Sequence, residues 1–199
     1  MGITSLSKPL GSYVVSINRL SKNLLKILMV IPKSCLSIAY LCIGLALIRS
    51  VNECRDGYLS LRWPNEVLCG ESLMFKYTLD DVRFSNDYGE ITLTLIIYED
   101  TLASIPNLRD VQEFIARFEL ILSNILNDLR EGLRFKYIQE YMRNLTLLGE
   151  EVLIILRDGS KISGEVLGLK LDGSLVLLRN NKVEYVDPLK VKSIETIWP

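Results

Sequence analysis

The run Leu61-Arg62-Trp63-Pro64-Asn65-Glu66-Val67-Leu68 constrains this chain more than any other stretch. Pro64 has no backbone N–H and a fixed φ, so a strand that enters the run must stop or bend there. Trp63 and Asn65 are then held on a rigid turn beside the carboxylate of Glu66, between two apolar strand-like pieces. Two interpretations are open: a structural turn around a packed Trp, or a turn that presents these side chains to a ligand.

The composition is typical of a globular protein. Of the 199 residues, 49% are hydrophobic and 24% are charged, which suits one medium domain or a domain with a small module. The absence of His excludes Ser-His and Cys-His nucleophiles and His-based zinc sites. Cys35, Cys42, Cys54 and Cys69 show no CxxC spacing, so we expect buried thiols in a reducing cytosol rather than disulfides or metal ligands.

Charge is spread unevenly along the chain. Residues 1–52 carry six basic side chains and no acidic one, whereas residues 53–149 carry ten basic and sixteen acidic side chains. A basic first quarter could face phosphate or anionic lipid. We favour a solvated basic surface whose acidic partners come from the middle of the chain.

The apolar stretch over residues 24–48 invites comparison with a membrane span. Lys26, Pro32 and Lys33 interrupt it, and the clean run over residues 36–48 has 13 residues, short of the roughly 20 that cross a bilayer. No small-residue cleavage site comes promptly after it, which argues against a signal peptide. We therefore predict a buried core helix in a cytoplasmic protein that does not associate with membranes.

The first three quarters of the chain mix strand and helix patterns. Strands are expected over residues 13–18, 24–31, 58–62, 67–69, 73–79 and 91–98, with a polar loop over residues 83–89. A helix capped by Ser34 or Ser37 should run to about Arg49. Asn107 is a candidate N-cap for a second helix, Gly132 ends that helix, and a third covers residues 135–145. The second helix has a strong apolar stripe: Phe114, Phe118, Ile121, Ile125 and Leu129.

The last fifty residues read as a small barrel. Short strands are expected over residues 151–156, 161–169, 174–178, 183–186 and 191–196, separated by the turn signals Arg157-Asp158-Gly159, Leu171-Asp172-Gly173 and Asn180-Asn181. The change of pattern near Leu147 predicts two domains with separate cores, residues 1–147 and 148–199.

This order, together with the Trp-Pro-Asn run, resembles the biotin protein ligases of the biotin/lipoate ligase superfamily. Arg62 stands for the family's Lys and Glu66 for its Asp, and Asp172-Gly173-Ser174-Leu175 resembles a motif of the family's C-terminal module. The resemblance implies an α+β fold, a mixed sheet packed with helices followed by a small SH3-like β-barrel. It also implies ligand binding at Arg62, Trp63, Pro64, Asn65 and Glu66.

Active members of that family bind biotin, ATP and Mg, form biotinyl-adenylate, and pass biotin to a lysine of a biotin carboxyl carrier protein. Their chemistry is positioning plus charge neutralisation, because the reacting anions must be brought together and stabilised. Three elements supply it in the family, and each is altered here. The first, a Gly-Arg-rich ligand loop, has no counterpart, since the segment that comes after this loop in the family is already matched from Ser7 onward. An incorrectly assigned start codon would also explain that loss.

The other two alterations lie within the chain. Ser72 replaces the Lys of the family's Lys-Leu-Ala-Gly type motif, and Phe75 replaces its Gly, where we expect the ring to fill the ligand pocket. In the strand that floors the adenylate site, Thr94 and Ile96 replace glycines and Tyr98 replaces an Asn. We treat these five as degenerate site positions.

The sequence therefore predicts a catalytically degenerate homologue that acts as a binding or regulatory protein, with no cofactor. Its expected partners are an active ligase subunit, a biotin carrier protein or a second copy of the chain. The alternative is an active, ATP-dependent biotin–protein ligase in which Arg62 replaces the lost Lys. Nucleic-acid binding is the weakest of the three hypotheses, because the small barrel carries a net charge of −1 and few exposed aromatic residues.

Overall fold

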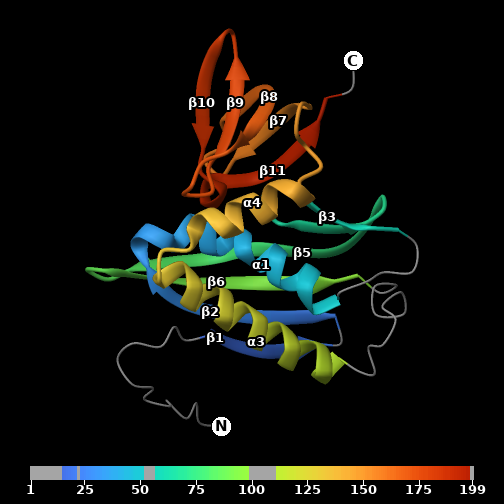
Figure 1. The fold of residues 1–199 in the computed structure, drawn as a ribbon, viewed down its shortest axis with the longest axis vertical. Coiled ribbons are helices and arrows are strands. Elements are labelled where there is room, and N and C mark those ends of the chain that lie inside the picture. Colours follow the sequence, from blue (N-terminus) through green and yellow to red (C-terminus); the bar gives the residue numbers. More distant parts are fainter. Residues whose placement is uncertain (1–14, 22, 52–56, 99–110, 198–199) are drawn as a thin grey trace.

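A six-stranded sheet forms the centre of the structure, a computed structural model that describes residues 15–21, 23–51, 57–98 and 111–197. Its strands lie in the order β1-β2-β6-β5-β4-β3, and every neighbouring pair is antiparallel (Figure 1). The mixed sheet predicted from the sequence is thus antiparallel in its described ladders, and one isolated bridge, Leu61 with Leu145, is parallel. The strands are β1 (Val15–Ser21), β2 (Leu24–Pro32), β3 (Leu59–Arg62), β4 (Glu66–Cys69), β5 (Ser72–Phe84) and β6 (Tyr88–Ile97).

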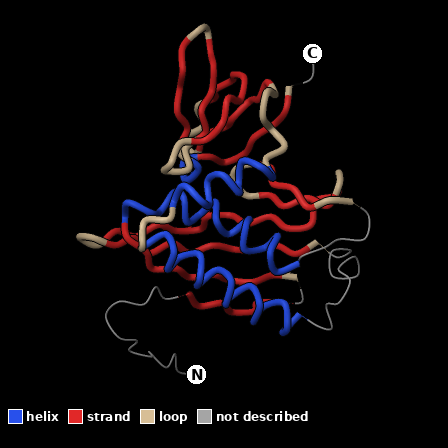
Figure 2. The backbone as a smooth tube through the Cα atoms, in the orientation of Figure 1, coloured by secondary structure: helices blue, strands red, loops and turns tan. Residues whose placement is uncertain are grey.

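Three helices cover one face of this sheet (Figures 1 and 2). Strand β2 alternates buried and half-buried residues along its length, and its buried positions face the helices. The apolar stripe beginning at Phe114 lies on one side of the long helix α3, as predicted. The helices are α1 (Leu36–Val51), α3 (Val111–Arg130) and α4 (Arg134–Asn144), and a short 3-10 turn, η1 (Lys33–Cys35), precedes α1.

Helix α1 explains the apolar stretch near the start of the chain. Lys33–Val51 is long and apolar enough to cross a membrane by length and composition, but 78% of its most apolar window is buried in the structure. On this face of the sheet the helix lies between α4 and α3 and packs against both (Figure 1). At Gly44 the helix packs tightly against strand β3, since an added Cβ there would lie 2.8 Å from Leu61 Cδ2. The apolarity of this segment is therefore that of a core helix.

The residues after Glu150 form a second sheet of five short antiparallel strands in the order β10-β9-β8-β7-β11. This small barrel-like sheet lies above the helices and the β3 edge in Figure 1. Its elements are β7 (Glu151–Leu156), β8 (Lys161–Leu169), β9 (Leu175–Arg179), β10 (Lys182–Val186), the 3-10 turn η2 (Pro188–Lys190) and β11 (Val191–Thr196). The fold is α+β, and most of these bounds agree with the predicted ones to within a residue or two.

The two parts share one core, contrary to the separate cores expected on either side of Leu147. Buried side chains of the small sheet, such as Ile154 and Leu177, belong to the same contiguous apolar cluster as the large sheet and its helices. Polar contacts join the parts as well: Ser37 Oγ donates to Asp187 Oδ1 at 2.9 Å. The division into residues 1–147 and 148–199 stays a prediction.

Further expectations need correction. The loop predicted over residues 83–89 is shorter, because Arg83 pairs with Glu90 and extends both strands of the β5–β6 hairpin. Cys35 and Cys42 are buried free thiols, as expected, but Cys69 is disulfide-bonded. The capping role expected of Asn107, the start of the first strand at residues 13–14, the Ser7 motif and Cys54 lie outside the described residues.

Candidate functional site

The Trp-Pro-Asn turn joins two strands of the large sheet. Arg62 ends β3 and Glu66 begins β4, and the two residues face each other across the hairpin. The turn residues between them include a cis peptide bond before Pro64. The bend predicted from Pro64 is therefore present, and it lies at the β3 side of the sheet, next to the small barrel-like sheet.

Trp63 is fully buried at the junction of the two parts of the molecule. Its indole Nε1 donates a hydrogen bond of 3.4 Å to the carbonyl of Gly173, in the turn between β8 and β9. Gly173 itself packs on helix α1, where an added Cβ would lie 3.0 Å from Leu41 Cδ1 and 3.2 Å from Ile38 Cα. The ring thus fills space between the large sheet and the small one, and its donor is already paired.

Pro64 and Asn65 are also bonded within the protein. The backbone carbonyl of Asn65 accepts from Tyr77 N at 3.0 Å, and Asn65 Nδ2 donates to Tyr77 O at 2.6 Å. Tyr77 Oη in turn donates to Pro64 O at 2.8 Å. Burial raises the pKa of Tyr77 well above its usual value, which keeps the phenol protonated as a donor. These contacts fix the turn on strand β5.

Arg62, Glu66 and Lys76 form an ion-pair cluster beside the turn. Glu66 Oε1 lies 2.8 Å from Lys76 Nζ, and Glu66 Oε2 lies 3.4 Å from Arg62 Nη1. The three side chains come from neighbouring strands, because Arg62 pairs with Glu66 and Glu66 with Lys76 in the ladders. Both cations are therefore partly neutralised by one half-buried carboxylate.

This cluster belongs to the face of the large sheet that lies opposite the helices, which we call the charged face. Further along it, Asp80 accepts from Lys26 Nζ at 2.9 Å and from Thr94 Oγ1 at 2.7 Å. Arg83 then pairs with Asp81 at 2.7 Å and approaches Glu90 at 4.0 Å. The described charged side chains of this face are Lys26, Arg62, Lys76 and Arg83 against Glu66, Asp80, Asp81 and Glu90. Four cations thus meet four carboxylates, and every one of them has a partner of opposite charge.

Thr94 and Ile96, two of the positions predicted to be degenerate, lie on the charged face. Thr94 is paired with Thr78 and Ile96 with Lys76 in the β5–β6 ladder, so the alternation of side chains places all four on one side of the sheet. Their side chains cover backbone that glycine would leave bare. Tyr98 comes directly after β6 and is partly exposed, and its N–H donates to Met74 O at 3.1 Å.

Phe75 lies on the other face, in the core between the sheet and helix α3, and the expectation that its ring fills a ligand pocket stays a prediction. It pairs with Ile97 in the ladder, is fully buried, and stacks on Phe114 of helix α3 with ring centroids 5.5 Å apart. The physical reason is a bulge: Leu73 is paired with Leu68 but Phe75 with Val67, so Met74 is an extra residue that changes the phase of the strand. Ser72 is exposed at the start of β5. The structure therefore does not bring Ser72 and Phe75 together with Thr94 and Ile96.

Lys76, Lys26 and Asp80 are among the residues of this face that were not predicted as site residues from the sequence. A signal for Lys76 was present, because β5 and β6 are adjacent and each alternates polar and apolar residues. Ile96, which pairs with Lys76, is among the site positions predicted from the sequence. The register of the β5–β6 pairing, however, is set by a hairpin and a bulge rather than by any local motif. Lys26 and Asp80 are 54 residues apart, and no short-range pattern links them.

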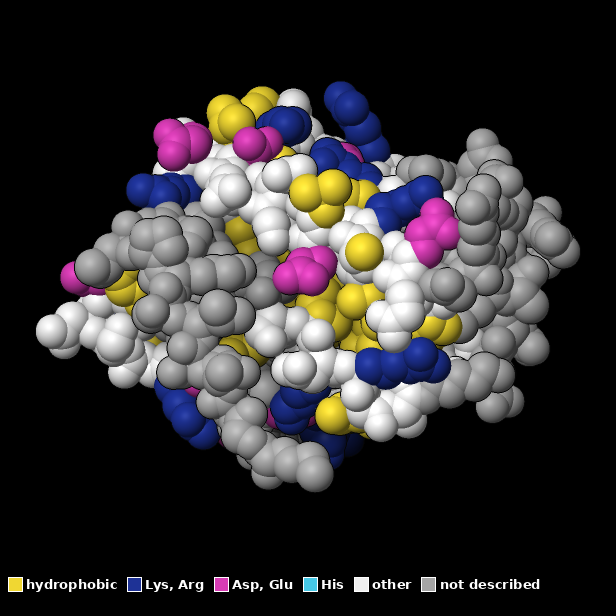
Figure 3. Space-filling view, turned by 90° about the horizontal axis from the view of Figure 1, so that it is seen from below, with side chains coloured by type: hydrophobic (Ala, Val, Ile, Leu, Met, Phe, Trp, Pro, Cys, Tyr) yellow, Lys and Arg dark blue, Asp and Glu magenta, His cyan; other side chains and the backbone are white. Residues whose placement is uncertain are grey.

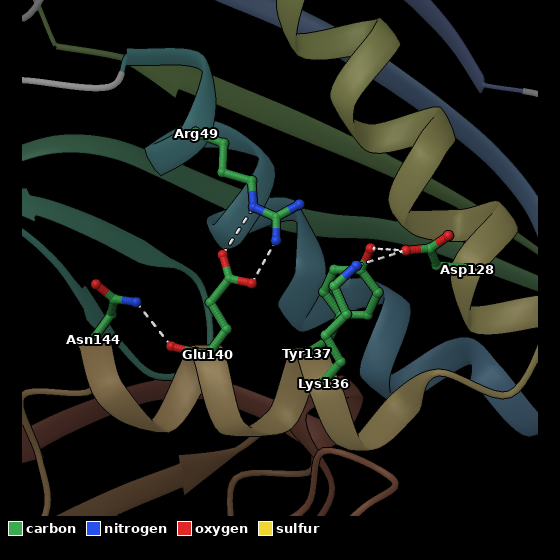
Figure 4. Close-up of polar contacts among 6 residues, drawn as sticks. All are labelled: Arg49, Asp128, Lys136, Tyr137, Glu140 and Asn144. Carbon is green, nitrogen blue, oxygen red and sulfur yellow. Dashed lines mark hydrogen bonds and ion pairs between the residues drawn. The ribbon is translucent and has the colours of Figure 1, made fainter.

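A second polar cluster ties helix α4 to helices α1 and α3 (Figure 4). Glu140 accepts from Arg49 through both carboxylate oxygens, with Nε at 2.8 Å from Oε1. Tyr137 Oη donates to Asp128 Oδ2 at 2.6 Å, and Lys136 Nζ lies 3.0 Å from the same oxygen. The hydrogen bonds from Tyr137 and Lys136 lower the pKa of Asp128. The Arg49 guanidinium lies over the Tyr137 ring, 5.4 Å from its centroid, and connects the two sets of contacts. Each of these charged groups thus has a partner within the protein, which indicates a structural role.

Two basic residues of the first quarter have acidic partners in the middle of the chain, the arrangement favoured from the sequence. Lys26 pairs with Asp80 and Arg49 with Glu140. Viewed from below, basic, acidic and hydrophobic side chains are interspersed over the described surface (Figure 3). Among the described residues, no group of three or more His, Cys, Asp or Glu side chains could hold a metal ion. On the side shown, the described residues therefore form no continuous basic surface for a polyanion, and the described residues form no metal site.

Comparison with solved structures identifies the fold. The chain is similar to the apo biotin protein ligase from Aquifex aeolicus, with a TM-score of 0.72, 18% identity, and coverage of 97% of this chain and 92% of that chain. The same enzyme in complex with biotin and ATP aligns with a TM-score of 0.68, 16% identity, and coverage of 97% and 92%. A biotin protein ligase-like protein of unknown function from a Silicibacter species aligns with a TM-score of 0.67, 14% identity, and coverage of 89% and 84%. The chain therefore has the biotin protein ligase-like fold that the Trp-Pro-Asn run suggested.

No protein-family model matches the sequence, and comparison with curated proteins gives no match. At identities below one fifth, the likeness to solved structures establishes the fold and leaves the chemistry to the residues of this chain.

Proposed function

We propose that this chain is a catalytically degenerate biotin protein ligase-like protein that acts by binding another protein. The observation that carries the proposal is the neutralised charged face. A nucleotide phosphate or a biotin carboxylate needs cations that are free to meet it, because charge stabilisation is the main catalytic resource of such a site. Here Lys76 and Arg62 share Glu66, and Lys26 is held by Asp80.

The backbone of β6 supports the same conclusion. A ligand that lies on a sheet needs close approach to bare backbone, which glycine permits. Thr94 and Ile96 instead place side chains there, and the hydroxyl of Thr94 is bonded to Asp80. These residues do not fit ATP laid on the strand, so we derive no chemical step through it.

The Trp-Pro-Asn turn supports the proposal from a third direction. The side-chain N–H groups of Trp63 and Asn65 already donate hydrogen bonds within the protein, to the carbonyls of Gly173 and Tyr77, respectively. In this chain we assign the turn a structural role, the fixing of the small sheet onto the large one. The partners that suit such a protein are those the fold suggests, an active ligase subunit or a biotin carrier protein, in the cytoplasm.

One observation favours the alternative, an active biotin–protein ligase that uses biotin, ATP and Mg. Lys76 is a lysine on the face that carries Thr94 and Ile96, and its side chain is about one third exposed. If Glu66 released it, Lys76 together with Arg62 could meet an anion. That alternative assigns binding or catalytic roles to Arg62 and Lys76.

Pyrophosphate release tests the two functions directly. The purified chain is incubated with biotin, labelled ATP and magnesium, alone and with a biotin carrier domain. We expect no pyrophosphate and no labelled carrier above a no-protein control, with a known active ligase as the positive control. Turnover that is abolished by Lys76→Met, but not by Lys192→Met on strand β11, would overturn the proposal in favour of the alternative.

A further inference from the structure

Strand β10 is an edge of the small sheet whose exposed side is apolar. It pairs with β9 on one side over five residues in unbroken register. Val183 and Tyr185 are 49% and 59% exposed, although β-branched and aromatic residues are favoured in strands because they pack well there. Lys170 Nζ lies 4.6 Å from the centroid of the Tyr185 ring. Figure 1 shows β9 and β10 projecting upward from the helices at the margin of the molecule.

The turn before β10 fixes which backbone groups face outward. Asn180 and Asn181 both have positive φ (50° and 60°), the signature of a two-residue type I′ hairpin. The residues that flank such a turn, Arg179 and Lys182, form a hydrogen-bonded pair, and such pairs alternate along an antiparallel ladder. The N–H and C=O groups of Val183 and Tyr185 therefore point away from β9. They form a row that another strand can join.

The opposite edge of the sheet is both charged and interrupted in its pairing, whereas β10 carries its charges, Lys182 and Glu184, in an unbroken register. Strand β11 has exposed Lys192 and Glu195, and its pairing with β7 is interrupted between Val191 and Ser193. Charged side chains and bulges are the usual devices that keep edge strands from pairing with other chains. On β10 the outward side chains extend an apolar row instead, because Val183 lies beside Leu178 and Tyr185 beside Val176 in the ladder.

We propose that β10 pairs with β10 of a second copy of this chain, antiparallel, about a two-fold axis through Val183. Charge complementarity selects the second copy as the occupant. In this register Val183 meets its counterpart in a hydrogen-bonded pair, and Lys182 of each copy lies opposite Glu184 of the other. Those two pairs are non-hydrogen-bonded ones, in which side chains approach most closely. The segment Lys182-Val183-Glu184 is thus complementary to itself, and within one copy Glu184 also lies 3.7 Å from Arg179 of β9.

The size of the contact sets the strength of the pairing. A single five-residue strand buries far less surface than the roughly 1,200–2,000 Å² of a stable interface. The dimer should therefore be weak, exchange rapidly and depend on protein concentration and ionic strength. It would join two small sheets into one continuous sheet and leave the charged face and the Trp-Pro-Asn turn untouched.

Charge reversal tests the register. Sedimentation velocity on the full chain over a wide concentration range should show a monomer–dimer equilibrium. Lys182→Glu places two carboxylates opposite each other at each pair, and Glu184→Lys places two ammonium groups there, so each variant alone should be monomeric. An equimolar mixture of the two variants should dimerise again, because both facing pairs are then opposite in sign, as they are in the wild type.

Two further variants separate pairing from folding. Val183→Pro removes an outward N–H, which an edge strand tolerates, and should weaken the dimer while leaving thermal unfolding nearly unchanged. The matched control, Lys192→Glu on β11, should leave the sedimentation profile unaltered. A wild type that stays monomeric at all concentrations would overturn the proposal. So would a dimer that survives both charge reversals, or a mixture that remains monomeric.

Discussion

The indole of Trp63 is hydrogen-bonded to the carbonyl of Gly173, which lies 110 residues further along the chain in the turn between β8 and β9. The contact connects the most distinctive motif of the large sheet with a hairpin of the small one. It also explains how the motif can be retained without ligand chemistry, because a buried Trp contributes a large apolar area wherever it packs.

Replacing Trp63 should therefore destabilise the whole protein. Trp63→Ala is expected to lower the free energy of unfolding by about 3–5 kcal/mol, the range for a buried aromatic residue replaced by Ala. Trp63→Phe keeps most of the ring area but loses the donor to Gly173, and should cost less, with about 1 kcal/mol attributable to the hydrogen bond. Urea denaturation measures both. The control is Tyr58→Ala, since Tyr58 is 76% exposed; an equal loss there would contradict the assignment.

Gly173 should resist substitution for two separable reasons. Its φ is +92°, which disfavours any Cβ, and an added Cβ would lie 3.0 Å from Leu41 Cδ1. Gly159 has a similar φ of +87° with nothing within 4 Å of its added Cβ, so Gly159→Ala reports the backbone strain alone. We expect Gly173→Ala to lower the melting temperature more than Gly159→Ala, by an amount equivalent to about 1–3 kcal/mol of overpacking. Equal shifts would mean that the β8–β9 turn does not press on helix α1.

The contacts of Asp128 with Tyr137 and Lys136 predict a pH dependence of stability (Figure 4). The pKa of Asp128 is lowered in the folded state by Tyr137 and Lys136, so its stabilising contribution is present above the unfolded-state pKa and is lost as the pH falls through the folded-state value. Asp128→Asn should cost less than about 1 kcal/mol at pH 7, because the group is partly exposed. The difference from wild type should shrink as the pH falls below about 4. Thermal unfolding from pH 7 to pH 2.5 measures it.

In a Lys136→Met background the same Asp128→Asn change should have a smaller effect, because the ion pair is already gone. An unchanged cost in that background would assign the contribution to the Tyr137 hydrogen bond alone.

The sequence predicted the elements better than the faces on which their residues lie. The strands of the small sheet follow a period of two between Gly and Asn turns, and the helix stripe beginning at Phe114 follows a period of 3.6, so both are local signals. The orientation of Phe75 depends on Met74 being an extra residue opposite β4, and a one-residue change of phase moves every later side chain to the other face. Nothing in the local sequence marks that bulge. The shared core likewise depends on pairs such as Trp63 and Gly173, which no spacing rule connects.

Phe75 now has a different expected role from the one suggested by the family motif. Because it stacks on Phe114 in the core, Phe75→Ala should lower the free energy of unfolding by about 3–5 kcal/mol. It should not create a biotin site, since the ring lies on the helix side of the sheet. Isothermal titration with biotin is expected to show no binding to the wild type or to Phe75→Ala. Micromolar binding gained by the variant would mean that the ring does occupy a ligand pocket.

Glu66 is the residue whose removal should change the chemistry of the charged face. Its carboxylate holds Lys76 at 2.8 Å and Arg62 at 3.4 Å, so Glu66→Gln leaves two cations with nearly unchanged shape around them. The variant should be less stable than wild type, since one carboxylate can no longer offset the two positive charges. Added pyrophosphate should raise its melting temperature, because an anion that binds the folded state stabilises it by mass action. The wild type should not respond, and about 0.5 M salt should abolish the response by screening. Glu195→Gln, on the remote strand β11, is the control for the loss of one negative charge. If pyrophosphate stabilised the wild type as much as Glu66→Gln, the cations of this face would be free for ligands already, and the case for a degenerate site would fail.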